Sequence, residues 1–370
     1  MTTTKSERRG KASATSRPDN SPRVQRWVRK HRDSPVPRGT AEPATIRLAL
    51  FLLATACLAG YAADSGALKL IQTIPLQGVK GRFDHFAIDA KGNRLFVAAL
   101  GINTLEVIDL AVGKRIQSVA DMSKPTGVLY LADHNQIAVA NGDDGTFKLL
   151  DGATFKVIHS LGGVPDADNL RLDPKTNLAW LGYGDGALGI IDPAGPKLTG
   201  SVKLAAHPES FQMEKQGARI FVNLPDAKQI AVIHREKRSI LQTWPMEKFG
   251  ANFPMALDES TGRLFVGCRK PPRLVVLDTS GGKPVADIAI CGDTDDLFWD
   301  AKRRRLYVSC GEGLVDVVEQ TSADHYQTLG RVTTAAGART SFYSPELDRY
   351  YVAVPEHGNQ QAQIRVFQPE

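Results

Sequence analysis

One phrase recurs through most of this chain, and its spacing limits the folds that the chain can adopt. Each copy has a short apolar stretch ending in Asp, a turn, a strand of the type Leu-Phe-Val, a polar turn and a further strand. The clearest copies begin at His85, Pro254 and Asp296. One apolar anchor residue marks the second strand of every copy. The anchors are Leu95, Ile137, Ala179, Ile220, Leu264, Leu306 and Tyr350, spaced by 42, 42, 41, 44, 42 and 44 residues.

A period of this length, with three or four short strands in each unit, is typical of a β-propeller blade. The strands are rich in Val, Ile, Leu and Phe, and Gly, Asn, Asp and Lys separate them, as hairpin turns require. The third strands are expected to end at Asp109, Asp151, Asp192, His234, Asp278, Glu319 and Gln368. We therefore predict an all-β, seven-bladed β-propeller over residues 64–370.

The two ends of the repeat region complement each other. The last repeat stops at its third strand, and one apolar segment, Leu68–Leu76, precedes the first repeat. Its Ile71-Gln-Thr-Ile resembles Ile116-Gln-Ser-Val, the fourth-strand segment of the first blade. We expect this N-terminal strand to complete the last blade, because that closure removes the open sheet edges of the ring.

The charge of the chain is unevenly distributed. The chain has 46 basic and 40 acidic residues, a net charge of +6. Residues 1–47 hold 12 basic and 4 acidic residues, and residues 48–63 hold none, which leaves 34 basic and 36 acidic residues, a net of −2, in the rest. A near-neutral body has no general attraction to phosphate, so nucleic acid is not a predicted partner.

Residues 1–63 are interpreted as a basic tail followed by a secretory signal. The apolar run from Leu48 to Ala59 is shorter than the roughly 20 residues that span a bilayer, but it suits the core of a signal peptide. Small residues favour cleavage after Ala62. An alternative is a lipid anchor at Cys57, which ends a loose lipoprotein motif. The prediction is a periplasmic or secreted protein without a membrane span.

The repeat also predicts which residues surround the mouth of the central channel. The innermost strand of each propeller blade starts on one face, and that start lies eleven residues before each anchor. These residues are Asp84, Thr126, Asp168, Glu209, Phe253, Asp295 and Arg339. They are followed by His85, Gly127, Asn169, Ser210, Pro254, Asp296 and Thr340. The positions beyond them turn apolar, so the prediction is a polar, mostly acidic mouth.

This mouth supplies the candidate ligand-binding residues, which are Asp84, His85, Asp168, Asn169, His207, Glu209, Asn252, Asp295, Asp296 and Arg339. Carboxylate oxygens are the ligands that Ca²⁺ prefers, so Asp168, Glu209 and Asp295 are candidates for a divalent cation site. The alternative is that these short polar residues only solvate the channel. Arg339 is the expected partner of the acids at 293–296, or else the contact for an anionic ligand.

Three cysteines are expected to gather at one junction between blades. Cys268 and Cys310 occupy the same repeat position in adjacent blades, and Cys291 lies on the connection between those blades. A disulfide from Cys291 to either neighbour is one expectation for an oxidising compartment. Burial as unpaired thiols is another, and a thiolate metal site is the third.

Loose tetrapeptides at Phe96–Ala99, Ala138–Asn141 and Tyr307–Cys310 occupy the same place in three repeats. On these segments the chain resembles the YVTN-repeat β-propellers, the YncE-like family of exported bacterial proteins, over about residues 67–370. The resemblance implies the propeller fold and an envelope location. Members of the family include binding proteins, and related propellers are subunits of quinone-dependent dehydrogenases.

The functional prediction is an exported binding or interaction module of the cell envelope, with a small-molecule or protein ligand at the channel mouth. The sequence has no haem-attachment motif, nucleophile elbow, phosphate-binding glycine loop or His-Glu-x-x-His, and no certain cofactor. One alternative is a divalent-metal-dependent lactone or ester hydrolase, by architectural analogy with propeller lactonases. The other is a propeller subunit of a periplasmic dehydrogenase.

Overall fold

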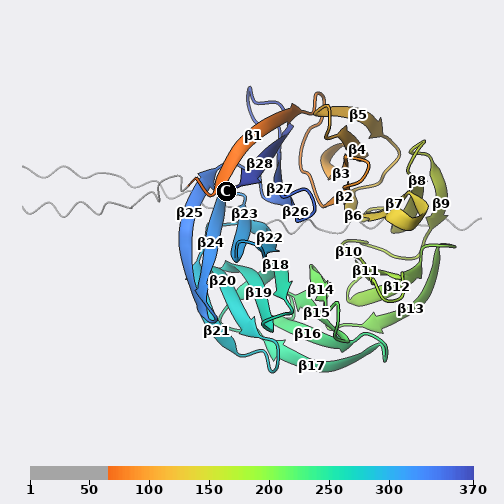
Figure 1. The fold of residues 1–370 in the computed structure, drawn as a ribbon. Coiled ribbons are helices and arrows are strands. Elements are labelled where there is room, and N and C mark those ends of the chain that lie inside the picture. Colours follow the sequence, from red (N-terminus) through yellow and green to blue (C-terminus); the bar gives the residue numbers. More distant parts are fainter. Residues whose placement is uncertain (1–65) are drawn as a thin grey trace, which may run out of the picture. The chain divides into compact units, whose positions relative to one another are not determined.

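The computed structural model describes residues 66–370, so the predicted basic tail, signal and lipid anchor lie outside the described residues. In this part of the chain, 28 strands form seven four-stranded antiparallel sheets arranged in a ring around a central channel (Figure 1). The predicted all-β, seven-bladed propeller is confirmed. No helix in the described part is long and apolar enough to cross a membrane.

The strands of blades 1 to 4 are named from the channel outwards. Blade 1 has β2 (Phe86–Asp89), β3 (Arg94–Ala99), β4 (Thr104–Asp109) and β5 (Lys114–Val119). Blade 2 has β6 (Pro125–Leu131), β7 (Gln136–Asn141), β8 (Thr146–Asp151) and β9 (Val157–Leu161). Blade 3 has β10 (Leu170–Leu172), β11 (Ala179–Tyr183), β12 (Ala187–Asp192) and β13 (Lys197–Lys203). Blade 4 has β14 (Phe211–Met213), β15 (Arg219–Leu224), β16 (Gln229–His234) and β17 (Ser239–Pro245).

The remaining blades follow the same order. Blade 5 has β18 (Gly250–Asp258), β19 (Arg263–Lys270), β20 (Pro272–Asp278) and β21 (Pro284–Ala289). Blade 6 has β22 (Thr294–Asp300), β23 (Arg305–Cys310), β24 (Leu314–Ser322) and β25 (His325–Thr333). Blade 7 has β26 (Thr340–Ser344), β27 (Arg349–Val354), β28 (Gln363–Pro369) and β1 (Leu68–Pro75). Two short 3₁₀ helices, η1 (Leu100–Ile102) and η2 (Ala132–His134), occupy turns.

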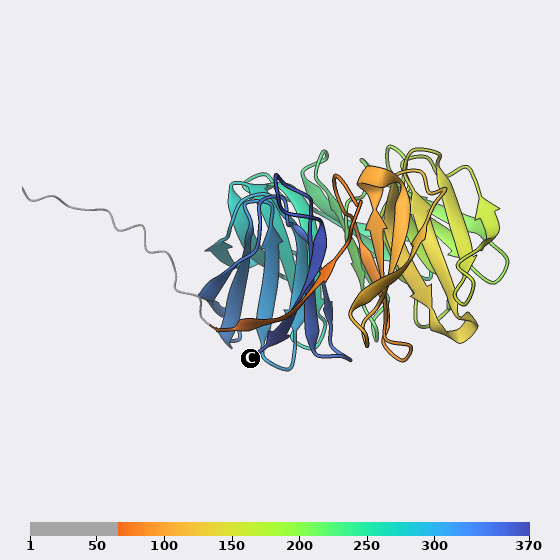
Figure 2. The same ribbon diagram turned by 90° about the horizontal axis from the view of Figure 1, so that it is seen from above.

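The ring closes as the sequence predicts. β1 pairs antiparallel with β28, from Leu68 opposite Pro369 to Pro75 opposite Gln363. The orange strand β1 therefore lies beside the blue strand β28 in both ribbon views (Figures 1 and 2). The first and last strands of the propeller share one sheet, so neither end leaves an unfinished blade.

The apolar core is divided among the junctions between blades. Seven clusters of buried side chains fill the seven junctions, one cluster between each pair of adjacent blades. The anchor residues of the repeat are all fully buried in the second strands: Leu95, Ile137, Ala179, Ile220, Leu264, Leu306 and Tyr350 are each 0% exposed. The sheets are thus apolar on both faces in their middle strands, and the innermost strands border the channel.

The outermost strand of every blade has a β-bulge at the same repeat position. The extra residue lies opposite the third strand where the pairing register shifts. The bulged residues are Ile71, Ile116, Thr199, Leu241, Val285, Leu329 and Ile158. The likeness between Ile71-Gln-Thr-Ile and Ile116-Gln-Ser-Val reflects this shared position.

The three cysteines lie in blades 5 and 6 and the connection between them. Cys291 forms a disulfide with Cys310, which selects one of the two pairings that the sequence left open. Cys268 is free and buried in the core between blades 4 and 5, whereas Cys291 and Cys310 lie between blades 5 and 6, so the expectation that all three gather at one junction is wrong. Burial raises the pKa of the Cys268 thiol to about 12. Cys268 therefore behaves as a small apolar core residue.

Candidate functional site

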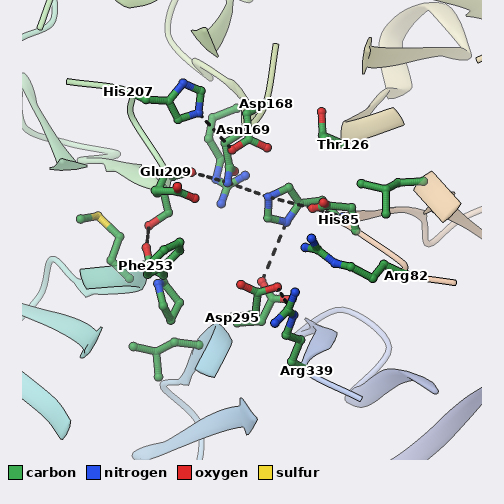
Figure 3. Close-up of a pocket in the computed structure, with 18 of the residues that line it drawn as sticks. Arg82, His85, Thr126, Asp168, Asn169, His207, Glu209, Phe253, Asp295 and Arg339 are labelled. Carbon is green, nitrogen blue, oxygen red and sulfur yellow. Dashed lines mark hydrogen bonds and ion pairs between the residues drawn. The ribbon is translucent and has the colours of Figure 1, made fainter. Parts of the chain in front are cut away.

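A pocket of about 340 Å³ opens at one end of the channel, and every blade contributes to its wall (Figure 3). All seven positions that lie eleven residues before the anchors line it: Asp84, Thr126, Asp168, Glu209, Phe253, Asp295 and Arg339. The wall has six carboxylates and five Arg or Lys side chains, with two histidines among them. The mouth is therefore polar but of mixed charge, rather than mostly acidic.

A repeated backbone hydrogen bond holds the equivalent side chains at the same level of the ring. Asp84 N–H donates to the Ala98 carbonyl at 2.9 Å. In blade 3, Asp168 N–H donates to the Gly182 carbonyl at 2.9 Å, and in blade 4 Glu209 N–H makes the corresponding bond. Each bond joins the residue two positions before an innermost strand to the second strand near its end, so blades 1, 3 and 4 direct carboxylates toward one space.

One side of the pocket holds Asp84, His85 and Asp168, whose metal-ligating atoms all lie within 4.8 Å of one another. His85 Nε2 is 3.6 Å from Asp84 Oδ1, and His85 Nδ1 is 3.9 Å from Asp296 Oδ1. Burial opposes protonation of His85, but Asp84, Asp296 and Asp168 together raise its pKa. We call Asp84, His85 and Asp168 the acidic triad.

Asn169 lies against the acidic triad and is 2% exposed. Its Nδ2 donates to the Glu209 carbonyl at 2.8 Å and lies 2.7 Å from His85 Nε2. Its Oδ1 is buried and has no hydrogen-bond partner. A buried acceptor without a partner is unusual in a folded protein, which makes Asn169 a notable residue of this wall.

His207 is held between two acids at the rim. Its Nδ1 lies 2.7 Å from the Gly184 carbonyl and 3.5 Å from Asp166 Oδ2, and its Nε2 lies 3.7 Å from Asp168 Oδ2. Burial opposes the charged form, but the contacts with Asp168, Gly184 and Asp166 raise the pKa of His207 to about 9. His207 is therefore a cation at neutral pH.

Three carboxyl groups of the pocket have raised pKa values. Burial is the main cause for Asp84, whose pKa is raised to about 7 with help from Asp168 and Asp295. Burial and the same two neighbours raise the pKa of Glu209 to about 7. Burial also raises the pKa of Asp296 to about 6. Such groups mark functional sites more often than ordinary surface acids do.

The opposite side of the pocket is a network of arginines and acids from blades 5 to 7. Arg339 contacts Asp293 at 2.7 Å and Asp295 at 3.1 Å. This is the partnership that the sequence predicted for Arg339. Arg269 also binds Asp295, and its guanidinium stacks 3.8 Å from the centre of the Phe253 ring. Phe253 and Arg269 thus form a flat wall.

The structure brings nine of the ten candidate residues to the pocket or its rim, and Asn252 is the exception. Asn252 is fully buried and donates to Asn223 Oδ1 at 3.0 Å, away from the pocket lining. Asn252 directly precedes the pocket residue Phe253. Successive side chains of a strand point to opposite faces, so Asn252 points away from the pocket. Whether the other nine bind a ligand stays a prediction.

The sequence argument missed several charged or polar residues of the pocket wall. Arg171 and Gln212 lie one position beyond Leu170 and Phe211, which pack in the core, so the channel stays polar deeper than expected. The sequence did contain a signal for Arg171. Alternate residues of a strand lie on the same face, and Arg171 follows Asn169 by two residues. Arg82, Lys124, Asp166 and Arg269 also line the pocket, and they lie outside the repeat position that was counted.

The proposed cation ligands are grouped differently from the prediction. Asp295 contacts the guanidinium groups of Arg269 and Arg339, so its oxygens are already paired. Asp168 instead lies with Asp84 and His85. An imidazole nitrogen in the set makes it less suited to Ca²⁺, which takes oxygen ligands.

Fold and pocket together define a class, a seven-bladed β-propeller with a charged pocket at one end of its channel. No protein-family model matches this chain, and no curated protein matches it. Among solved structures it is similar to hydrazine synthase of Kuenenia stuttgartiensis, with a TM-score of 0.66 and 15% identity over 78% of this chain and 98% of that chain. At this identity the likeness shows the fold alone. The resemblance to the YVTN-repeat family stays a prediction.

Proposed function

We propose that the chain is an exported binding protein of the cell envelope that holds a small organic anion, with a carboxylate group, in the channel pocket. The observation that carries this proposal is the presence of two pocket guanidinium groups, those of Arg82 and Arg171, that form no ion pair with a carboxylate in the described part of the chain. Asp84 acts on the first, and Asp168 and Asp296 act on the second, only at longer range. Arg82 reaches over the pocket mouth (Figure 3). Arg171, deeper in the wall, donates a hydrogen bond to the Leu170 carbonyl.

The chemistry of the wall supports a carboxylate ligand. A guanidinium group presents paired N–H donors that match the two oxygens of a carboxylate. Burial lowers the pKa of Arg171, although Asp296 and Asp168 act in the opposite direction, and an anion in direct contact would offset more of the cost of burial. Phe253, stacked on Arg269, offers an apolar face for the body of the ligand. A mixture of one apolar wall and a few polar groups is typical of small-molecule sites.

A thermal-shift screen tests the proposal. Hydroxy-, keto-, amino- and dicarboxylic acids are added to protein that has been treated with EDTA and then dialysed, and the melting temperature is measured. We expect at least one carboxylate to raise it in the wild type but not in Arg82→Ala. Lys237→Ala, in the turn between β16 and β17, is the control and should respond like the wild type. The proposal is wrong if no carboxylate acts, or if the response survives in Arg82→Ala.

A metal-dependent hydrolase is a second candidate function, favoured by the acidic triad alone. A bound cation there would act as a Lewis acid on a lactone or ester carbonyl. Hydrolysis of such substrates should then disappear with EDTA and return with added metal. The dehydrogenase-subunit alternative stays a prediction.

A further inference from the structure

The acidic triad has the dimensions of a metal site. His85 Nε2 and Asp84 Oδ1 are 3.6 Å apart, and all three groups offer ligand atoms within 4.8 Å of one another. Zinc binds nitrogen and carboxylate oxygen at about 2.0–2.2 Å, which separates neighbouring ligand atoms by roughly 3–4 Å. Small side-chain rotations would therefore bring the three groups onto one ion.

The position of the triad in the pocket wall favours binding of an ion over simple solvation. The side chains of Asp84, His85 and Asp168 are only 17%, 21% and 17% exposed. Two carboxylates so close together and so little solvated repel each other. His207 Nε2 already lies 3.7 Å from Asp168 Oδ2, and a cation between the two carboxylates would add to that compensation. All three residues line the pocket, which provides a path for entry.

Asn169 provides an independent observation at the same place. Its side chain is almost fully buried, touches His85 Nε2 through Nδ2, and has an Oδ1 atom without a partner. If the carboxamide turned over, Oδ1 would face the ion as an additional ligand. Nδ2 would then give up the Glu209 carbonyl. Oxygen and nitrogen are not distinguished by the shape of an amide, but Oδ1 would then lie 2.8 Å from the Glu209 carbonyl oxygen, so a rotation of the side chain must accompany the turn.

We propose that Asp84, His85 and Asp168, with Asn169 as a further ligand, form a binding site for a divalent transition-metal cation of the Zn²⁺ type. The mixed set of one imidazole nitrogen and carboxylate oxygens suits zinc and its neighbours, whereas Ca²⁺ takes six to eight oxygen ligands. The site therefore differs from the Ca²⁺ site that the sequence suggested. It does not depend on the carboxylate-binding proposal, which concerns Arg82 and Arg171.

Calorimetric titration of the full-length chain with ZnCl₂ alone, after EDTA treatment and dialysis, tests the site. We expect one ion per chain at the pocket and binding at least about tenfold weaker in Asp84→Asn and in His85→Gln. The matched controls Asp185→Asn, in the turn between β11 and β12, and His134→Gln, in η2, should bind as the wild type does. CaCl₂ should bind at least about tenfold more weakly than ZnCl₂.

A measurement on the wild type avoids any variant that fails to fold. Diethyl pyrocarbonate modifies accessible imidazoles, and mass spectrometry of the digested protein locates the modified residues. Zn²⁺ should protect His85 but leave His134 reactive. The proposal is overturned if Zn²⁺ leaves His85 unprotected, if both triad variants bind Zn²⁺ as tightly as their controls, or if Ca²⁺ binds more tightly than Zn²⁺. The carboxylate screen uses metal-free, dialysed protein and this titration contains no carboxylate, so failure of either proposal is recognised separately.

Discussion

His85 shows how single residues determine the character of this pocket. It belongs to blade 1, yet its imidazole lies close to Asp296 of blade 6 and Asn169 of blade 3. These neighbouring side chains are largely buried, so ionisation of the carboxyl groups is costly. A carboxyl whose pKa is raised by folding stabilises the protein at low pH, and this contribution is lost as the pH rises through the raised value.

The first prediction concerns Asp84, which is surrounded by His85, Asp168, Asp295 and Arg82. Its pKa rises from 3.8 to about 7 on folding, so in EDTA the melting temperature should fall between about pH 4 and pH 7. In Asp84→Asn the fall should be smaller, because an amide cannot ionise. Thermal melts from pH 4.5 to 8 check this. The exposed Asp143, changed to Asn as a control, should leave the wild-type slope intact, and an equally steep fall in Asp84→Asn would contradict the argument.

At the scale of elements, each of the seven sheets keeps an open outer edge, so closure by β1 completes blade 7 but does not remove the sheet edges as the sequence argument expected. An unpaired edge strand is a template for association with another sheet. The bulge in each outer strand interrupts the regular pattern of edge groups. Four of the bulged residues, Ile71, Ile116, Ile158 and Leu241, are exposed apolar side chains. The bulge alone does not set this exposure, because the bulged Val285 and Leu329 pack against the core.

Strand β1 contains one buried and one exposed isoleucine, so the effect of burial on stability can be tested within a single strand. Ile74 is 0% exposed in the core between blades 7 and 1, whereas Ile71, in the bulge, is 46% exposed. Ile74→Ala should lower the free energy of unfolding by about 2–5 kcal/mol. Ile71→Ala should change it by less than about 0.5 kcal/mol. Urea unfolding measures both, and equal losses would show that β1 does not pack as described.

At the scale of the whole molecule, the pocket exists only in the closed ring. Its lining comes from all seven blades, and β1 is needed to complete blade 7. If the chain is exported as proposed, cleavage of the signal must therefore leave β1 intact. The predicted cut after Ala62 does so, since β1 begins at Leu68.

The expected N-terminus of the exported protein is therefore Ala63. Expression of the full gene in a bacterium, followed by fractionation and N-terminal sequencing of the periplasmic or secreted protein, checks this expectation. A lipid-modified N-terminus at Cys57 would support the alternative lipid anchor. An N-terminus within or beyond β1 would contradict closure of the ring by this strand, and retention in the cytoplasm would contradict export.

The sequence by itself determined the repeat, and with it the number of blades, the buried anchors, the closing strand and the ring of residues around the mouth. These features follow from local alternation and turn chemistry, which each blade expresses independently. The pairing of Cys291 with Cys310 and the wall formed by Arg269 and Phe253 were decided only in the tertiary structure. So were the burial of Asn252 and the grouping of Asp168 with Asp84 and His85. These contacts depend on which way each side chain points across a curved ring, and residues from distant blades meet only when that ring has closed.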